Sequence, residues 1–267
     1  MTPPIVTCLI AALFTVRYEV SPQVPNAARQ NYPAVIRDSS ERRAKAEREW
    51  RRMLDSYGVP QTPPDLHPIT NTPRALQSVS GGIKILASPA DPNNDTFALR
   101  EAMKSFIDRW RELLGLDPSS VSLTSVESSG DTQKLTYRQA NFAYPVAGNF
   151  GEMTAAVSRD GILLQLDDRF VPVVDLPSRP LVQRDTAAKK VAGRSFSYAD
   201  ASGRQQLTQI AAGAVSVKRL VVLPIEKGDA VEVHLAWELV AGTSLSWTVY
   251  IDAVTGEELR VVQNFQT

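Results

Sequence analysis

The sequence predicts an α+β fold built from two small units, each an antiparallel sheet covered by helix, after a helical and proline-rich N-terminal region. Two observations lead to this fold class. Apolar residues recur at helical spacing between Leu99 and Leu114, and then alternate at strand spacing over residues 121–166. The same order, helical segments followed by alternating strands, returns over residues 186–262.

The N-terminal region is predicted to hold one amphipathic helix at residues 38–57. Asp38, with Glu41 three residues later, forms a start like a capping box, and Gly58 provides the residue that ends the helix. A narrow apolar stripe runs along one side of this helix: Ala46, Trp50, Met53, Leu54 and Tyr57. We expect the stripe to pack on its own domain, although it would also be the docking element of a scaffold protein.

The middle of the chain has the composition of a linker and leads into the first helix-and-sheet unit. Prolines and the pair Gly81-Gly82 mark residues 58–94 as this linker, interrupted by one short strand at 83–86. We therefore place a domain boundary near residue 92. The predicted domains are a signal sequence (1–20), an N-terminal helix with a Pro-rich linker (21–92), the first unit (93–175) and the second unit (176–267).

An Asp160-Gly161 turn sets the register of the hairpin in the first unit. A two-residue type I′ turn there places Val157 opposite Leu164 and Ala155 opposite Leu166, so that one face of both strands is apolar. The helix over 96–114 has the apolar stripe needed to cover that face. In the second unit we expect helices at 186–192 and 205–212, and strands at 217–225, 230–240, 245–251 and 258–262.

Charge and composition argue against some classes of function. Lys plus Arg and Asp plus Glu each number 29, and this balance argues against a surface for nucleic acid or anionic membranes. The apolar run 5–16 is too short to cross a bilayer and suits a secretory signal, so we expect a secreted or periplasmic protein without stable membrane insertion. Cys8 is the one cysteine of the sequence, which rules out an intrachain disulfide.

Residues that could perform chemistry are scarce. The two histidines, His67 and His234, are not spaced as a zinc-binding pair, and we interpret them as an exposed linker residue and a sheet-face residue. Asp167 and Asp168 are adjacent on a strand and point to opposite faces. No nucleophile elbow or phosphate-binding glycine loop occurs in the sequence. We therefore expect no catalytic, cofactor-binding or metal-binding residue, and a protein that is not an enzyme.

Several short motifs, taken in order, carry a resemblance to a known family. They are LGLDP (114–118), YPVAG (144–148), LAWEL (235–239) and WTVYIDAVTGEEL (247–259). Together they resemble the FTP and PepSY modules in the propeptides of thermolysin-like and fungalysin-like metallopeptidases, over about residues 97–264. Ala143 and Asn141 depart from the glycine and the aromatic residue usual in that family, and no peptidase domain follows within the 267 residues.

The resemblance implies a stand-alone propeptide-like protein that inhibits or helps to fold a secreted zinc metallopeptidase, which would be its protein partner. It implies recognition through a sheet edge and aromatic anchors rather than through reactive side chains. Candidate contact residues lie in the loop 141–150 and in the C-terminal tail: Phe142, Tyr144, Phe150, Val261, Val262 and Phe265.

Alternatives remain open both for the candidate contact residues and for the function of the whole protein. The loop aromatics could instead pack beneath their own loop, and the tail could be a frayed terminus. The protein as a whole could be a structural module of an exported surface assembly, or a prodomain relic of a peptidase that lacks its catalytic part.

Overall fold

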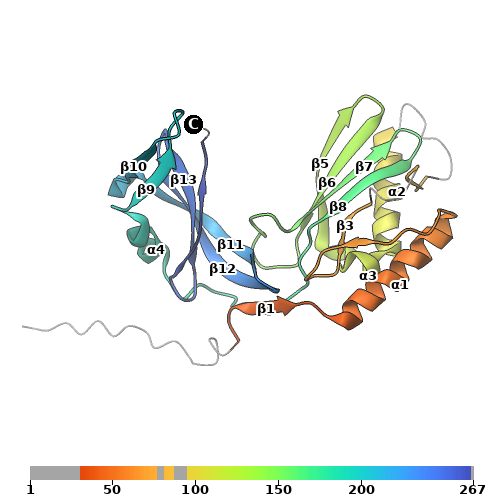
Figure 1. The fold of residues 1–267 in the computed structure, drawn as a ribbon, viewed down its shortest axis with the longest axis horizontal. Coiled ribbons are helices and arrows are strands. Elements are labelled where there is room, and N and C mark those ends of the chain that lie inside the picture. The colour runs from red at the N-terminus through yellow and green to blue at the C-terminus, as the bar shows by residue number, and fades with distance from the viewer. Residues whose placement is uncertain (1–30, 77–80, 87–94, 266–267) are drawn as a thin grey trace, which may run out of the picture.

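The computed structural model describes residues 31–76, 81–86 and 95–265. Figure 1 shows two lobes, each built on an antiparallel sheet, that diverge from a shared base. The predicted signal sequence, Cys8 and the predicted boundary near residue 92 lie outside the described residues.

The first lobe consists of a five-stranded sheet and the three helices that cover one of its faces. The strand order is β4-β8-β7-β6-β5, and every neighbouring pair is antiparallel. Its elements are α1 (Ser40–Tyr57), β4 (Ile83–Lys84), α2 (Asp95–Arg109), α3 (Arg111–Leu114), β5 (Val121–Ser129), β6 (Thr132–Gln139), β7 (Glu152–Ser158) and β8 (Ile162–Asp168).

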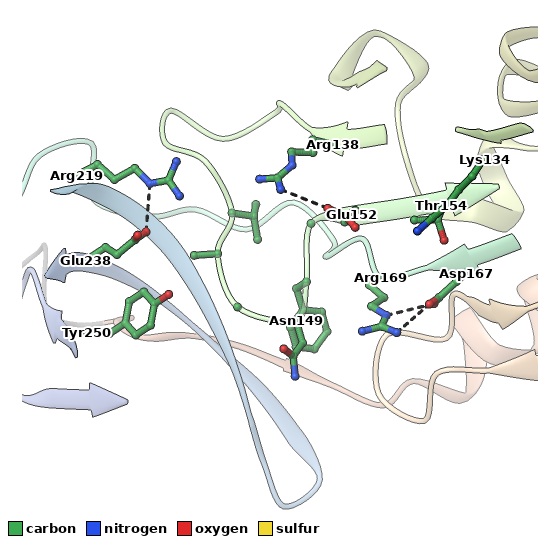
Figure 2. Close-up of a pocket in the computed structure, with 15 residues that line it drawn as sticks. Lys134, Arg138, Asn149, Glu152, Thr154, Asp167, Arg169, Arg219, Glu238 and Tyr250 are labelled. Carbon is green, nitrogen blue, oxygen red and sulfur yellow. Dashed lines mark hydrogen bonds and ion pairs between the residues drawn. The ribbon is translucent and has the colours of Figure 1, made fainter. Parts of the chain in front are cut away.

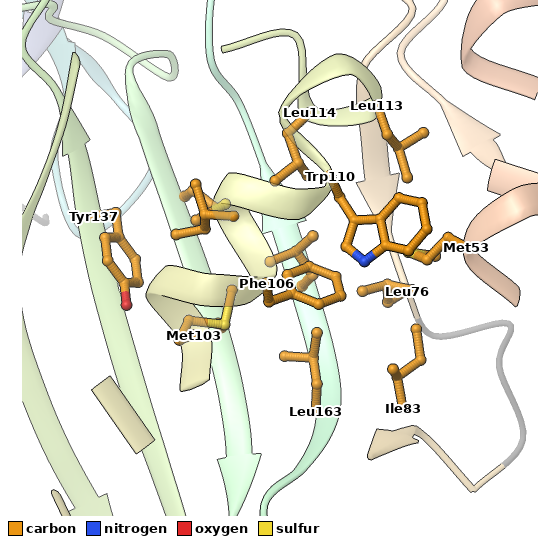
Figure 3. Packing of buried hydrophobic residues seen from close by; sticks show 14 of the residues in the cluster. Met53, Leu76, Ile83, Met103, Phe106, Trp110, Leu113, Leu114, Tyr137 and Leu163 are labelled. Atoms are coloured by element: carbon orange, nitrogen blue, oxygen red, sulfur yellow. The ribbon is translucent and has the colours of Figure 1, made fainter. Parts of the chain in front are cut away.

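One large apolar cluster holds this lobe together. The predicted stripe of α1 lies inside it, since Trp50, Met53 and Leu54 are fully buried. Figure 3 shows Phe106 of α2 and Trp110, which directly follows α2, between that stripe and the strand that carries Leu163. The α1 stripe therefore packs on its own lobe, as expected, and is not available to a docking partner.

The start of α1 differs from the prediction by one residue. Ser39, not Asp38, is the N-cap, and its hydroxyl accepts a hydrogen bond from the Arg42 N–H. Asp38 instead accepts a hydrogen bond from the Asn71 side chain, at 3.0 Å. The predicted helix end is confirmed, because Gly58 has the left-handed conformation (φ 63°) that a C′ residue needs.

The segment predicted as a linker contains paired strands. β2 (Asp65–Leu66) and β3 (Pro73–Ala75) form a small two-stranded sheet beside α1. The chain then reaches the main sheet, where the Leu76 N–H donates to the Leu166 carbonyl and β4 pairs with β8. The prolines thus limit strand length here without preventing strands.

The second lobe is a curled antiparallel sheet in which β12 is the central strand. β11 lies on one side of β12, while β1 and β13 share its other side and β14 follows β13. Its strands are β1 (Ala34–Arg37), β11 (Val215–Lys227), β12 (Ala230–Gly242), β13 (Ser246–Asp252) and β14 (Glu258–Gln263). The helix α4 (Arg184–Val191) and the hairpin of β9 (Ser195–Ala199) and β10 (Gln205–Gln209) pack at one end.

The predicted fold class of two small helix-covered sheet units is therefore wrong. The structure is mostly β, with 41% strand against 23% helix and four α-helices in the described part. Only the first lobe is backed by several helices; the second sheet is long and curled, and α4 is its one α-helix among the described residues. The prediction failed because β1, from the supposed N-terminal region, joins this sheet, and because the residues predicted as a helix at 205–212 mostly form β10.

The hairpin of β7 and β8 has a three-residue turn rather than the predicted two-residue turn. Arg159, Asp160 and Gly161 form it, and Gly161 has φ 75°. An irregularity follows within β8, where the register shifts between Val157 and Ala156 and Leu164 is the extra residue. This shift offsets the longer turn, so that Ala155 faces Leu166 as predicted. Val157 faces Leu163, not Leu164.

Candidate functional site

The loop between β6 and β7 joins the two lobes. Val146 of this loop forms a parallel bridge with Val222 on the outer edge of β11. The Ala147 N–H donates to the Val222 carbonyl and the Val222 N–H donates to the Pro145 carbonyl, each at 2.9 Å. The YPVAG segment thus acts as a short added strand within its own chain.

A close backbone approach closes this loop. Gly151 has φ 76°, and a Cβ atom placed on it would lie 2.4 Å from the Cβ of Val146. No side chain fits there, so glycine is required at this position. The turn directs Phe150 into an apolar cluster between the lobes, together with Val146, Val222 and residues of β1 and β12.

The three aromatic residues predicted as partner anchors contact the protein itself. Phe150 is 9% exposed, and its ring lies edge-on to His67. Phe142 and Tyr144 are half-buried against the same cluster, and the Tyr144 hydroxyl donates to the Ser178 carbonyl at 3.0 Å. Their packing beneath the loop leaves part of Phe142 and Tyr144 open to a partner, and little of Phe150.

The lobes enclose a cleft whose floor is this loop. Its volume is about 490 Å³. Figure 2 shows Arg138, Glu152, Asp167 and Arg169 on the first sheet opposite Arg219, Glu238 and Tyr250 on the second, with Asn149 between them. The walls are the face of the first sheet opposite its helices and the face of the second sheet opposite α4.

The charges in the cleft are largely paired. Arg138 and Glu152 lie 3.4 Å apart, Arg169 and Asp167 2.8 Å apart, and Arg219 and Glu238 3.1 Å apart. The hydrogen bond from Arg169 to Asp167, followed by their Coulomb attraction, raises the pKa of Arg169. Three of the four basic side chains that line the cleft face an acidic one, and Lys134 is the fourth, so the cleft has no strong single-sign field to attract phosphate or nucleic acid.

The C-terminal residues predicted as contacts lie on and after an edge strand. Among the described residues no strand pairs with the outer side of β14. Val261 is 37% exposed on this strand, whereas Val262 is half-buried. Phe265 is held in place, since its ring lies edge-on to Trp247 at 5.2 Å and to Tyr198 at 5.4 Å. The tail is thus packed as far as Phe265 rather than frayed.

The structure brings the predicted contact loop 141–150 and the predicted C-terminal contact residues partly together. Ala147 of the loop and Val262 of β14 contact the same apolar cluster beside the cleft. A Cβ atom on Gly148 would lie 3.4 Å from the Arg260 guanidinium. Phe265, by contrast, belongs to the cluster around Trp247 at the far end of the sheet.

A buried polar network was missed by the sequence interpretation. His234 is 4% exposed, with Nδ1 2.8 Å from Asp252 and Nε2 3.1 Å from Glu232. Carboxylates can only accept, so an imidazole with hydrogens on both nitrogens satisfies both contacts. The Tyr32 hydroxyl donates to Asp252 at 2.9 Å and accepts from the Leu235 N–H. This network fastens the segment before β1 to the second sheet.

Hydrogen bonding decides the charge of Asp252. Burial acts to raise the pKa of its carboxyl, but donors from His234, the Thr255 and Val254 N–H groups and Tyr32 outweigh burial and lower the pKa. Asp252 also stabilises the turn that follows it, since its Oδ1 accepts the N–H of Val254 at 2.7 Å. For the network around His234, the one signal in the sequence was the alternation of β12, which places His234 on the sheet face.

Asp168 is the opposite kind of buried carboxyl. It is 1% exposed, and burial raises its pKa to about 8, despite the hydrogen bond from the Phe170 N–H at 2.8 Å. Its Oδ2 has no hydrogen-bond partner among the described residues. Asp167, its neighbour, faces the cleft, as the predicted opposite orientation of the pair requires.

Two features are absent from the described residues. No group of three or more His, Cys, Asp and Glu side chains there is arranged to hold a metal ion. No helix in the same residues has the length and apolar character to cross a membrane.

Comparison with known proteins places the chain in no family. No family model and no curated protein matches it. Among solved structures it is similar to the Bacillus megaterium YpeB C-terminal domain, with 15% sequence identity and a TM-score of 0.35, over 87% of this chain and 100% of that one. A likeness at this level carries no argument about fold or function, and the resemblance to FTP and PepSY modules stays a prediction.

Proposed function

We propose that the protein is a secreted or periplasmic propeptide-like binding protein that inhibits or assists the folding of a zinc metallopeptidase. The observation that supports this most directly is the unpaired edge of β14. This edge carries the exposed Val261, and Arg260 of the same strand approaches Gly148 in the floor of the cleft. An extended segment of a partner can add to such an edge through main-chain hydrogen bonds.

The hydrogen-bond pattern identifies the groups that would bind. The Asn264 N–H donates to the Ser246 carbonyl, so Asn264 and Val262 direct their backbone groups toward β13. The intervening residues, Val261 and Gln263, direct theirs outward. Val261 therefore offers both an apolar side chain and an unpaired N–H at the same position of the edge.

The scaffold alternative loses its predicted docking element. The α1 stripe that would have contacted a partner is buried in the first lobe. The relic-prodomain alternative depends on the genomic sequence beyond Thr267, and no feature of the structure favours it. We therefore carry only the inhibitor or chaperone proposal to experiment.

Inhibition and refolding assays with a thermolysin-like peptidase from the same source test the proposal. The purified protein is expected to slow the peptidase or to raise its refolding yield. Val261→Pro removes the outward N–H but no bond of the β13–β14 ladder, and it should weaken the effect about tenfold. Val261→Thr keeps the N–H and is the matched control.

Two outcomes would contradict the proposal at different levels. If the wild-type protein neither inhibits nor helps to refold any such peptidase, the proposed function is wrong. If the wild type is active and Val261→Pro is equally active, the partner binds elsewhere and strand addition at β14 is wrong.

A further inference from the structure

A second groove lies away from the cleft, between α2 and the edge strand β5. Its volume is about 390 Å³, within the range of ligand-binding pockets. Its floor is apolar and is formed by Ile107, Val121, Leu123 and the ring of Tyr137. Nothing in the proposed function uses this groove.

An unpartnered polar group lies in the floor. Tyr137 is 6% exposed, and its hydroxyl has no hydrogen-bond partner among the described residues. Figure 3 shows this hydroxyl directed away from the packed side chains of the core. Burial raises the pKa of Tyr137, so the hydroxyl keeps its proton and remains a donor. A buried donor without an acceptor is unfavourable, and an acceptor supplied by a ligand would remove that penalty.

The basic side chains of α2 lie nearer the groove floor than its acidic ones. Successive residues turn by about 100° around a helix. Arg100 and Lys104 are therefore within about 60° of the buried Ile107, while Glu101 and Asp108 are at least about 100° away from it. No ion pair involves Arg100 or Lys104 within the described ranges. The inner rim of the groove is thus positively charged and available to a carboxylate.

The edge of β5 offers backbone groups beside the groove. No strand in the described part of the chain pairs with its outer side. The Ala140 N–H donates to the Ser120 carbonyl, which makes residues 120 and 122 the ones bonded to β6. Leu123 accordingly directs its N–H and C=O groups outward. Val121 offers only its C=O there, because its N–H already donates to the Pro118 carbonyl. The side chains of both residues line the groove.

We propose that this groove binds the C-terminal end of an extended peptide whose last residue is apolar. The peptide backbone pairs with β5, its last side chain lies on the apolar floor, and its carboxylate contacts Arg100, Lys104 and the Tyr137 hydroxyl. A chain end is favoured because an apolar side chain and a carboxylate then belong to one residue, as the floor and the rim together require. The β5 edge favours a peptide over an isolated small acid.

Fluorescence anisotropy with a panel of short labelled Thr/Val peptides, each ending in Leu, Val or Phe with a free carboxylate, tests the proposal. At least one peptide is expected to bind, and its amidated form should bind about tenfold more weakly because the charge is lost. Arg100→Glu should weaken binding by tenfold or more. Arg48→Glu, an exposed arginine of α1, is the matched control and should leave binding unchanged.

Tyr137→Phe separates a binding role from a structural one. It removes only the unpartnered hydroxyl, so the melting temperature should stay the same or rise while peptide binding weakens about three- to tenfold. A lower melting temperature would show that the hydroxyl has a partner in the fold, and would overturn the proposal.

Three further results would also overturn it. The first is that no peptide of the panel binds. The second is that amidated and free peptides bind equally. The third is that N-acetyl-leucine competes as strongly as the peptide on a molar basis, because pairing with β5 would then contribute nothing. None of these results depends on the β14 edge, so this inference and the proposed function can fail separately.

Discussion

The two lobes are held together by different physical means. The first has one broad apolar cluster in which three helices cover a sheet. The second divides its apolar residues among smaller clusters, and it adds a buried network of Tyr32, His234 and Asp252, a strand from the N-terminal region and a loop from the first lobe. The second sheet has fewer helices to cover it, and segments distant in sequence together with buried polar groups stabilise it instead.

The comparison predicts that the largest single-residue effect lies in the first lobe. Trp110 is 1% exposed within the apolar cluster, so Trp110→Ala should lower the free energy of unfolding by about 3–5 kcal/mol, measured by urea denaturation. Phe97→Ala in the preceding helix α2 is the control, because Phe97 is 62% exposed and should change stability by less than about 0.5 kcal/mol. Equal effects of the two substitutions would contradict the assigned core.

In the second lobe, a polar substitution should have nearly as large an effect. Asp252→Ala leaves His234, Tyr32 and two backbone N–H groups without their acceptor, and should cost about 3 kcal/mol. Tyr32→Phe should weaken the attachment of β1 and increase hydrogen exchange at residues 34–37. If both variants have wild-type stability, the network does not close this lobe.

The pH dependence of stability should have opposite signs in the two lobes. For Asp252 the folded pKa is lowered, so its contribution is present above the unfolded pKa, near 4, and is lost as the pH falls through the folded value. For Asp168 the folded pKa is raised to about 8, so the folded state holds a proton that the unfolded state releases between about pH 4 and pH 8. Stability from Asp168 is therefore lost as the pH rises through that window.

Asp168→Asn tests this sign. Asn keeps an acceptor for the Phe170 N–H and cannot ionise. Between pH 4 and pH 8 the unfolding free energy of the wild type should fall relative to that of the variant, by up to roughly 1.4 kcal/mol per pH unit. Parallel stability curves for the two proteins would show that Asp168 is ionised in the folded state. Asp160→Asn, at an exposed turn, is the control.

The contact between the lobes should give the smallest effect. Ala147→Pro removes the N–H that donates to Val222 and should cost about 1–2 kcal/mol, with a wider distribution of lobe distances in small-angle scattering. Ala143→Pro is the control and should leave both quantities unchanged, because it changes an exposed residue of the same loop whose N–H donates to no described group. A scattering curve that is unchanged for Ala147→Pro would mean that the apolar cluster alone fixes the lobes.

Elements with strong local patterns were predictable. The helix that begins at Ser40 and the long alternating strand Ala230–Gly242 were predicted close to their observed bounds. The helix predicted at 96–114 is helical over most of its length, but the structure divides it at Trp110 into α2 and α3. Each carries enough apolar residues at one period to define a buried face on its own. Residues 205–209 were wrongly predicted as part of a helix, because the apolar pattern of a short exposed strand is too weak to distinguish it from a helix.

The candidate site was predictable in place but not in arrangement. The loop 141–150 was singled out for its aromatics, proline and glycines, and it does form the floor of the cleft. Its docking on Val222 could not be foreseen, since one parallel bridge leaves no periodic signal. Tyr137 was interpreted only as part of an alternating strand, and its unpartnered hydroxyl becomes visible once α2 and β5 are placed around it.

By itself the sequence determined the periods, the chain-reversing turns and the scarcity of reactive side chains. Tertiary structure alone decided that β1 joins β12, that Tyr32 bonds to Leu235 from 203 positions away and that His234 meets Asp252. The physical reason is that local patterns report which face of an element is buried, whereas the choice of partner depends on which surfaces and polar groups remain unsatisfied after every element has packed.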